Sequence, residues 1–557
     1  MMKKFGRKAL ALSLTAVLGA SMVLTGCGGK SKNEGKKGED STTKIGLTTG
    51  LASDTTADIS IMTWSGDSKY YEDIGSMDLS TDKLTSQNVA QVYAVAKQFK
   101  KLYPNIKINL WAKTGDPDQP GTPKWEQEMT SFKAKYGKYP DIWASTSVTN
   151  DIKKGLAADL SVFSDDETYK AYNENLMSNL NYYGFQGGLP SFSIPWGIWV
   201  NKALAESKNI NVPDPDWTID EYTRFFTKSD NTSFWGDKST VNIINMGTTT
   251  INKQIKEKGT VDLDSDEVKS LLSYIPKWAA STIDVAEGAG TLSKDIKIES
   301  KTYSWYYFCN NRCLTNITDP WYLTAGADES AKESESYIDS KDWDIYPFPS
   351  TDYCGNTIKV VMDPICIHNY AADDGNKEWN DDEKAKLKAT YTFATYWTAS
   401  TEAKQAIFDQ KWTDNGAEKS AAGDSFPVVT GDTYKKQMDI WNNLPAHKTY
   451  KDKEGWKEIL KLWENNESWD YIDKCWTSKI TEKGETTDVL YEWNNMWNEE
   501  VAGAWMTDKD WGDKVKARLS DWNTTINKRI ETATKQLQDK LVENYNFDKS
   551  KFTSDNK

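Results

Sequence analysis

The segment from residue 58 to residue 145 alternates between two hydrophobic patterns, and this alternation constrains the fold more than any other feature. Residues 58–64 form a largely apolar run and residues 106–110 alternate apolar with polar side chains, which predicts two strands. Residues 140–145 predict a third strand. Between them, residues 89–103 and 123–136 carry apolar side chains at steps of three and four, as amphipathic helices do. This order of elements predicts a parallel α/β sheet.

The ends of these three strands are the first candidates for a binding site. In parallel sheets, ligands bind at the loops that follow the carboxyl ends of the strands. Each predicted strand ends near a tryptophan, namely Trp64, Trp111 or Trp143. We expect the first strand to end in a turn at residues 65–67, which places Asp67 in a loop.

The rest of the chain predicts mainly helices. Thr218 and Glu221 have the spacing of a capping box and predict a helix that starts there. Further helices are expected at about 265–280, 383–399, 401–411 and 433–443, and the last hundred residues are expected to be helical and rich in tryptophan. Trp456 and Trp463, seven residues apart, are expected in the core. One stripe at helical spacing comprises Trp511, Val515, Leu519, Trp522, Ile526, Ile530, Leu537 and Leu541.

Length, charge and hydropathy exclude several classes of protein. A chain of 557 residues predicts more than one domain. Its mean hydropathy of -0.70 excludes a polytopic membrane protein. A net charge of -14 offers no basic face for nucleic acid. With two histidines, His368 and His447, chemistry that depends on several histidines is also excluded.

The N-terminus has the pattern of a targeting segment. Four basic residues precede an apolar run at residues 9–24, which is short for a membrane span and typical of a secretory signal peptide. The sequence Leu24-Thr-Gly-Cys27 resembles a bacterial lipobox, in which Cys27 becomes the lipid-modified first residue. Residues 1–26 are therefore predicted to be removed, and residues 27–57, rich in Gly, Ser, Thr and Lys, to form a flexible tether.

Cysteine usage and motif searches give no catalytic or metal site. Five cysteines remain after Cys27, so at least one thiol is unpaired. A Cys354–Cys366 disulfide stays open beside the alternative that both thiols are buried and free. The sequence lacks His-Glu-x-x-His, Gly-x-Ser-x-Gly and Cys-x-x-Cys. We therefore expect no cofactor, no metal and no enzymatic activity, although a carboxylate pair for glycoside cleavage stays open.

The order of short segments resembles the extracellular solute-binding lipoproteins of bacterial ABC importers (family 1), in the branch that includes maltose-binding protein. The matching pieces are residues 61–64, 99–106, 139–142, 155–160, 188–190, 200–202, 217–221, 319–321, 344–349, 401–405 and 426–427. They follow one another over residues 58–430, behind the lipobox. The segment from residue 431 resembles the closing helices of the family and is longer.

The resemblance implies an α/β fold of the periplasmic-binding-protein type, with two lobes, three crossovers and an extended helical C-terminal tail. Residues 58–188 and 361–427 would form the N-terminal lobe, and residues 189–360 and 428–557 the C-terminal lobe. Ligand would bind in the cleft between the lobes, which would close by a hinge motion.

The resemblance also implies a function. Such a protein, a monomer anchored by lipid on the extracytoplasmic face of the bacterial cell membrane, would capture a carbohydrate and deliver it to the permease of an ABC transporter. The 25 Trp and 27 Tyr suit this ligand because aromatic faces pack against sugar C–H groups. The residues expected to bind it are Trp64, Asp67, Trp143, Trp196, Trp199, Asp319, Trp321 and Asp363.

An oligosaccharide is the expected ligand, and three alternatives stay open. A solute-binding protein of this charge could instead take a peptide or a cation. A lipid-anchored glycosidase would use a similar aromatic cleft together with two carboxylates. An adhesin without transport is the third alternative.

The lipobox makes a prediction about where the protein is found. Replacing Cys27 by Ala removes the thiol that would carry the lipid, so the variant should move from the membrane fraction to the soluble fraction. Cell fractionation followed by immunoblotting measures this. A variant that stays with the membrane after a high-salt wash would contradict the lipid anchor.

Overall fold

The computed structural model describes residues 50–79, 84, 86–114, 125–226, 239–279, 304–317, 337–375, 377–414, 417–423, 425–445, 447–465, 469–470, 479–482, 485–496, 499–502 and 511–553. All of them belong to one unit, residues 44–557. The signal peptide, Cys27 and nearly all of the tether fall outside the described residues, so the predictions made for them stay predictions.

A parallel sheet lies at the centre of one half of the protein, which we call the first half. Its strands are β1 (Ala57–Tyr71), β2 (Ile106–Thr114) and β3 (Ile142–Ala144), in the order β2-β1-β3. Helices α1 (Gln87–Leu102) and α2 (Trp125–Tyr136) lie between these strands in the sequence. The predicted strand–helix alternation and the parallel pairing are therefore confirmed.

Strand β1 runs further than the sequence predicts. It continues past Trp64 to Tyr71 and stays paired with β2, with register shifts around Gly66. Such irregularities let a strand bend without leaving the sheet. The turn predicted at residues 65–67 is therefore wrong, and Trp64 lies within the strand. Asp67 also lies in β1, but its side chain is outside the described part of the structure.

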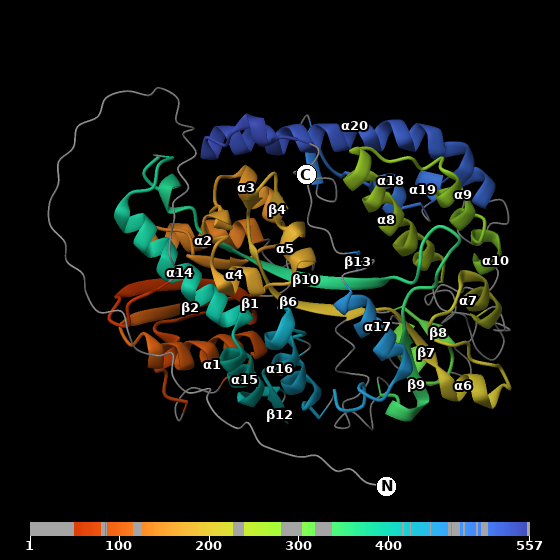
Figure 1. Ribbon diagram of the computed structural model, residues 1–557, viewed down its shortest axis with the longest axis horizontal. Coiled ribbons are helices and arrows are strands. Elements are labelled where there is room, and N and C mark those ends of the chain that lie inside the picture. The colour runs from red at the N-terminus through yellow and green to blue at the C-terminus, as the bar shows by residue number, and fades with distance from the viewer. Residues whose placement is uncertain are drawn as a thin grey trace, which may run out of the picture. The chain divides into compact units, whose positions relative to one another are not determined.

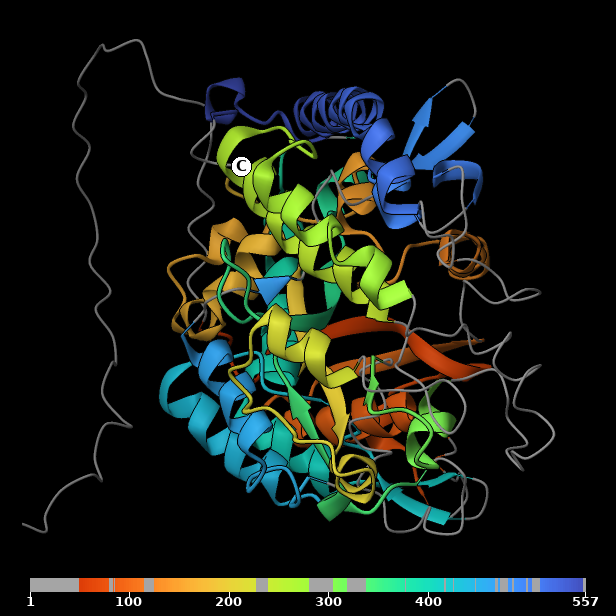
Figure 2. The same cartoon turned by 90° about the vertical axis from the view of Figure 1, so that its right-hand side faces the viewer.

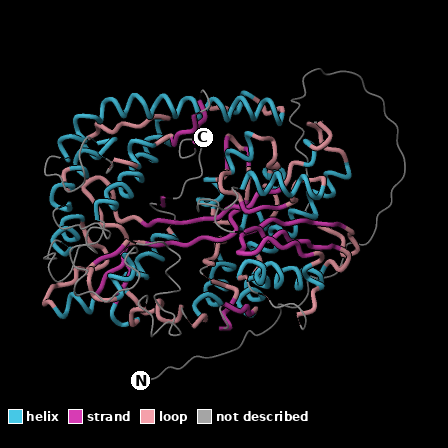
Figure 3. Tube along the Cα trace, turned by 180° about the vertical axis from the view of Figure 1, so that it is seen from behind, coloured by secondary structure: helices cyan, strands magenta, loops and turns pink. Residues whose placement is uncertain are grey.

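Two long antiparallel strands connect the first half to the rest of the chain. Strand β6 (Leu189–Trp196) pairs with β10 (Ile358–Ile367), and the far end of β10 pairs with β3 in the first half. The near end of β10 pairs with β13 (Trp469–Asp470). We call the pair β6 and β10 the ribbon; Figure 3 shows it running across the middle of the molecule.

The second half is built on a smaller sheet that follows the ribbon. Its strands are β7 (Ile198–Asn201), β8 (Thr315–Asn316) and β9 (Trp343–Tyr346), in the order β8-β7-β9. The helices that accompany it are α6 (Lys202–Ser207), α7 (Ile219–Phe226), α8 (Ser239–Lys258), α9 (Asp266–Leu272), α10 (Ile275–Ala279) and α12 (Ser304–Cys309). The capping box is confirmed, because Thr218 N donates to Glu221 Oε2 (2.8 Å) and Glu221 N to Thr218 Oγ1 (3.3 Å).

The remaining elements complete the two halves. Helices α14 (Asp381–Ala399) and α15 (Thr401–Asp409) confirm two predicted helices. Shorter elements are α3 (Val148–Lys153), α4 (Glu167–Ala171), α5 (Glu174–Asn179), β4 (Asn181–Tyr182), β5 (Phe185–Gln186), β11 (Lys411–Asp414), β12 (Ala417–Ser420), β14 (Lys479–Glu482), β15 (Glu485–Asp488), α18 (Tyr491–Asn494) and α19 (Glu499–Ala502). The lobe boundaries expected from the resemblance stay a prediction.

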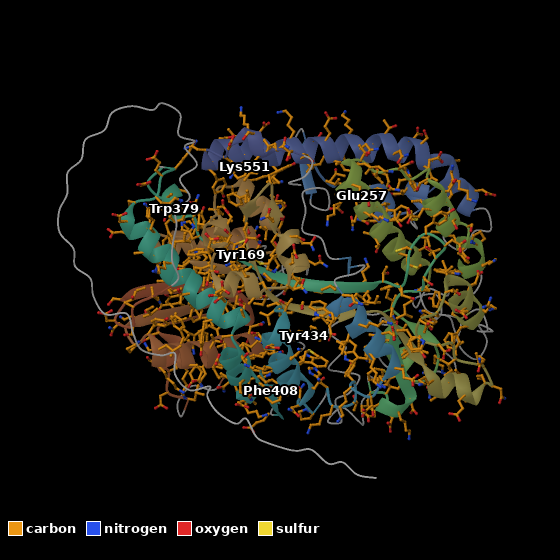
Figure 4. The ribbon with its side chains drawn as sticks, viewed as in Figure 1. Tyr169, Glu257, Trp379, Phe408, Tyr434 and Lys551 are labelled. Carbon is orange, nitrogen blue, oxygen red and sulfur yellow. The ribbon has the colours of Figure 1, made fainter. Side chains whose placement is uncertain are left out.

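Aromatic side chains cover one face of the ribbon. Helices α16 (Gly431–Asn442) and α17 (Glu454–Glu464) lie below the ribbon in Figure 1, and Tyr434 of α16 is labelled there in Figure 4. Phe426 pairs with Ser193 of β6, and its ring contacts Trp441 and Trp463. Trp456 and Trp463 are buried, as predicted. This cluster is the core that supports the ribbon from behind.

The C-terminal segment is only partly as predicted. Helix α20 (Trp511–Tyr545) is 35 residues long, and the described members of the predicted apolar stripe, Val515 to Leu541, are buried. Strands β13, β14 and β15 show that the last hundred residues are not all helical. No helix in the described part of the chain, α20 included, is both long and apolar enough to cross a membrane.

The cysteines that the structure describes form no disulfides. Cys309, Cys313, Cys354 and Cys366 form no disulfide, so the Cys354–Cys366 alternative is wrong; of these two thiols Cys366 is buried, as the other alternative expects, and Cys354 is only partly buried. The reason lies in the fold: Cys366 is buried in β10, with its Sγ 3.8 Å from an Asp151 oxygen, whereas Cys354 lies in the loop before β10.

His447 makes the aromatic cluster sensitive to acid. It is buried, stacks on Trp441 at 3.7 Å, and its burial lowers its pKa to about 3. The unfolded chain binds this proton near pH 6.5 and the folded protein does not, so stability falls as the pH falls below 6.5. Relative to His447→Gln, the free energy of unfolding should lose about 2 kcal/mol between pH 6.5 and pH 5. Urea unfolding of both proteins at several pH values measures this, and equal pH profiles would contradict it.

Candidate functional site

The two faces of the ribbon differ in burial. On the back face, which meets the aromatic cluster, Ser193, Val360 and Met362 are buried. Residues directly opposite each other in an antiparallel pair share a face. The pairs Asp363–Phe192, Val361–Ile194 and Lys359–Trp196 therefore lie on the other face, where every side chain except the buried Ile194 is partly accessible. We call this the front face, and it is the candidate site.

Asp363 is the unusual group of the front face. Burial raises the pKa of its carboxyl group to about 6. Its carboxylate has no hydrogen-bond or ionic partner among the described residues; only its backbone oxygen is engaged, by Ser191 Oγ at 2.7 Å. A buried charge without a partner costs stability, so a group that persists in this state is a candidate for binding a ligand.

Two aromatic side chains of β6 lie on the same face as this carboxylate. Phe192 lies directly across from Asp363, and Trp196 lies at the end of the strand, where its ring meets Phe348 edge-on at 6.0 Å. Both rings are half-buried. The Nε1 of Trp196 is buried and has no hydrogen-bond partner in the described part of the chain. The front face thus combines aromatic surface with an unused donor and an unused acceptor.

Asp151 fixes the loop that follows β3, the strand paired with the far end of β10. The Asp151 carboxylate accepts hydrogen bonds from Trp143 Nε1 (2.9 Å) and Ser145 Oγ (2.6 Å). Burial raises the pKa of Asp151, and these two hydrogen bonds oppose the shift. Ser145 N donates to Pro364 O at 2.9 Å, which joins the loop to the residue after Asp363. A cavity of about 290 Å³ opens here, lined by Trp143, Ser145, Asp151 and neighbouring residues.

Lys359 gives the front face a second ionisable group. It lies four residues before Asp363 on β10, and burial lowers its pKa to about 7. The face therefore holds one acid and one base whose pKa values both lie near neutrality.

The structure brings two of the predicted site residues onto one face. Trp196 and Asp363 share the front face, whereas Trp143 is buried and pairs with Cys366, three residues beyond Asp363 on β10. Trp64 lies on β1, two strands from β10, with Lys113 Nζ 4.7 Å from its ring centre. Their roles in binding stay predictions.

The other predicted residues are placed differently or not described. Trp199 is 1% exposed and packs against Trp305 (4.8 Å) and Trp343 (4.6 Å) in the core of the second half. Asp319 and Trp321 lie outside the described residues, so the expectation that they bind ligand is not addressed.

Sequence reasoning missed Phe192, Lys359, Ser145 and Asp151. Lys359 and Asp363 stand at alternate positions in the otherwise apolar run of β10, a pattern that would have predicted a strand with one partly exposed face. Asp151 has no such signal, because its role depends on contacts with Trp143 and Cys366 that only the fold brings about.

This arrangement suits binding more than catalysis. A carboxylate accepts hydrogen bonds from hydroxyl groups, and aromatic faces pack against C–H groups. Asp151, the other carboxylate described above, is already engaged by Trp143 and Ser145. No cluster of three or more His, Cys, Asp or Glu side chains suited to a metal occurs among the described residues.

Comparison with known proteins identifies the fold. No family model matches the sequence, and no curated protein matches it. Among solved structures, the chain is similar to the cyclic alpha-maltosyl-1,6-maltose binding protein from Arthrobacter globiformis, with a TM-score of 0.50 at 12% identity, over 86% of this chain and 100% of the other. The protein therefore has the two-lobed α/β fold of this class of binding protein, and the resemblance inferred from the sequence is confirmed at the level of the fold.

Two further structures are similar over comparable lengths. An ABC substrate-binding protein from Listeria monocytogenes in complex with cycloalternan matches 89% of this chain and 100% of its own, with a TM-score of 0.47 at 14% identity. A family 1 extracellular solute-binding protein from Bifidobacterium longum subsp. infantis matches 84% of this chain and 99% of its own, with a TM-score of 0.46 at 17% identity.

The contrast between Trp199 and Trp196 gives a testable prediction. Replacing the buried Trp199 by Ala leaves a cavity and should lower the free energy of unfolding by about 3–5 kcal/mol. The matched change at the half-buried Trp196 should cost clearly less, because its ring already meets solvent on one side. Chemical unfolding of both variants measures the difference, and an equal loss would show that Trp196 is also a core residue.

Proposed function

We propose that this protein captures a carbohydrate, an oligosaccharide, on the front face of the ribbon and delivers it to the permease of an ABC transporter. The observation that carries this proposal is Asp363, a largely buried carboxylate without a partner, placed across from Phe192. Sugar hydroxyl groups would donate to this carboxylate and compensate the cost of burying it.

The aromatic residues support the same ligand class. Phe192 and Trp196 offer ring faces on the same side of the ribbon as Asp363. Sugar rings present C–H groups that pack on such faces, while their hydroxyl groups at the edge reach polar partners. The protein of the same fold from Arthrobacter globiformis is described as binding a cyclic maltosyl-maltose, which agrees with this proposal.

The sequence supports an extracytoplasmic location. The lipobox at Cys27 and the tether to residue 57 would hold the binding unit at the outer side of the cell membrane by lipid alone. In this proposal the protein acts as a monomer, has no enzymatic activity, and its partners are the sugar and the permease subunits.

A cationic ligand is the second candidate, since an unpaired carboxylate also attracts a positive charge. The two candidates differ in their response to salt. Binding of a cation to Asp363 would weaken as ionic strength rises, whereas hydrogen bonding to a neutral sugar would change little.

Asp363→Asn tests the proposal through two opposite effects. Ionising Asp363 in the folded protein costs about 2–3 kcal/mol, since its pKa rises from 3.8 to about 6. The free energy of unfolding of the variant at pH 7.5 should therefore be higher than that of the native protein. The same variant should bind its sugar at least tenfold more weakly, because a hydrogen bond to a charged group contributes about 1.5–3 kcal/mol. Chemical unfolding measures the first effect.

Calorimetry with the sugar found by a thermal-shift screen of mono- and oligosaccharides measures the second effect. Affinity of the native protein should also fall below pH 6, as Asp363 takes up a proton, and that of the variant should not. Asp432→Asn, an exposed carboxylate on α16, is the matched control and should change neither quantity. A screen without a sugar ligand, or unchanged affinity in Asp363→Asn, would contradict the proposal.

A further inference from the structure

Helix α20 contacts both halves of the protein. In Figure 1 it runs on the side of the ribbon opposite to α16 and α17, from α9 and α19 at one end to α3 at the other. Figure 2 shows it nearly along its axis, with α8 below. At 1.5 Å per residue, its 35 residues span about 50 Å. A helix of this length can reach from one half to the other without a break.

Two asparagines fix the first part of α20 to the second half. Asn527 binds both polar backbone groups of Val261: its Oδ1 accepts from Val261 N (2.8 Å) and its Nδ2 donates to Val261 O (2.9 Å). One turn earlier, Asn523 Oδ1 accepts from Leu263 N at 2.8 Å. These side chains lie on the same face of the helix and bind the segment between α8 and α9.

The last turn of α20 is fixed to the first half in the same manner. Asn544 Nδ2 donates to Lys153 O at 2.9 Å, and Tyr545 Oη donates to Ala157 O at 2.8 Å. The Tyr545 ring packs edge-on against Phe185 at 4.7 Å. Here too the partners are backbone groups: Lys153 is the last residue of α3, the helix that carries Asp151, and Ala157 lies four residues further on.

Between these two ends the helix is held along its length. Its apolar stripe is buried, and Arg529 forms a two-pronged ion pair with Glu492 of the segment that packs beside it. In Figure 4, Glu257 of α8 and Lys551, which follows α20, mark the two halves beneath it. Asn523 and Asn544 are 21 residues apart, about 30 Å along the axis. A continuous helix changes this length little, so the separation of its two attachment sites is nearly fixed.

We propose that α20 is a brace that holds the two halves in one relative orientation. The ribbon alone is a pair of strands, and strands between two bodies can bend as a hinge. Helix α20 is a further connection, roughly parallel to the ribbon and attached at both ends, and it opposes that bending. The site on the front face is therefore preformed, and ligand binds without a large closing motion. This inference does not depend on which ligand binds.

The experiment releases one end of the helix at a time. Asn523→Ala/Asn527→Ala frees the second-half end, and Asn544→Ala/Tyr545→Phe frees the first-half end. Lys535→Ala, which removes only an exposed ion pair with Asp539, is the matched control. All three are made in the full chain, and circular dichroism checks folding. If Asn544→Ala/Tyr545→Phe does not fold, the single variant Tyr545→Phe, which removes only one hydroxyl group, is used in its place.

Two measurements on ligand-free protein decide the question. Small-angle X-ray scattering should give a larger radius of gyration for either end variant than for native protein and the Lys535→Ala control. Calorimetric unfolding should show one transition for native protein and two for the end variants, because the halves are no longer coupled. Native-like scattering and a single transition in both end variants would overturn the proposal, as would two separate transitions in the native protein.

Discussion

The pairing of β6 with β10 is the constraint on which the rest of the structure depends. The same strand β10 pairs with β3 in the first half, with β6 along its middle and with β13 at its start. A strand shared in this way cannot shift its register without turning every side chain to the opposite face. Burial of Val360 and Met362 against the aromatic cluster therefore also places Lys359 and Asp363 on the front face. The packing of the core determines the position of the site.

Function at this site opposes stability. The folded protein would be more stable if Asp363 had a partner or were a neutral residue. Burial raises its pKa to about 6, and no group in the described structure compensates the cost of its charge. Asp151 shows the alternative on the neighbouring loop, where Trp143 and Ser145 both donate to the carboxylate. The Asp363 carboxylate is available to a ligand, whereas the Asp151 carboxylate holds the loop after β3, although both residues are aspartates.

The sequence was sufficient for the elements and insufficient for the site. Periodicity located β2, α1, α2 and α14 closely, because each buries one regular face. It failed at Trp64, where a bulged strand continues through a stretch that reads as a turn. Trp196 and Trp199 stand three residues apart in one apolar segment, yet one lies on the front face and the other in the core. Their difference arises from partners far along the chain, Phe348 and Trp343, which no local pattern reveals.

The ribbon and helix α20 connect the halves with different physical consequences. The ribbon is held by side chains that pack on its back face, so it can flex while that packing is kept. Helix α20 is held at its ends by hydrogen bonds to backbone atoms of residues 153, 157, 261 and 263, which a change in the separation of the halves would strain. If the ribbon alone joined the halves, part of the binding free energy would be used to close them around the ligand. With α20 in place, the halves are ordered during folding, and binding does not include that cost. The long C-terminal helix therefore favours a protein that binds in a preformed geometry over one that closes around its ligand.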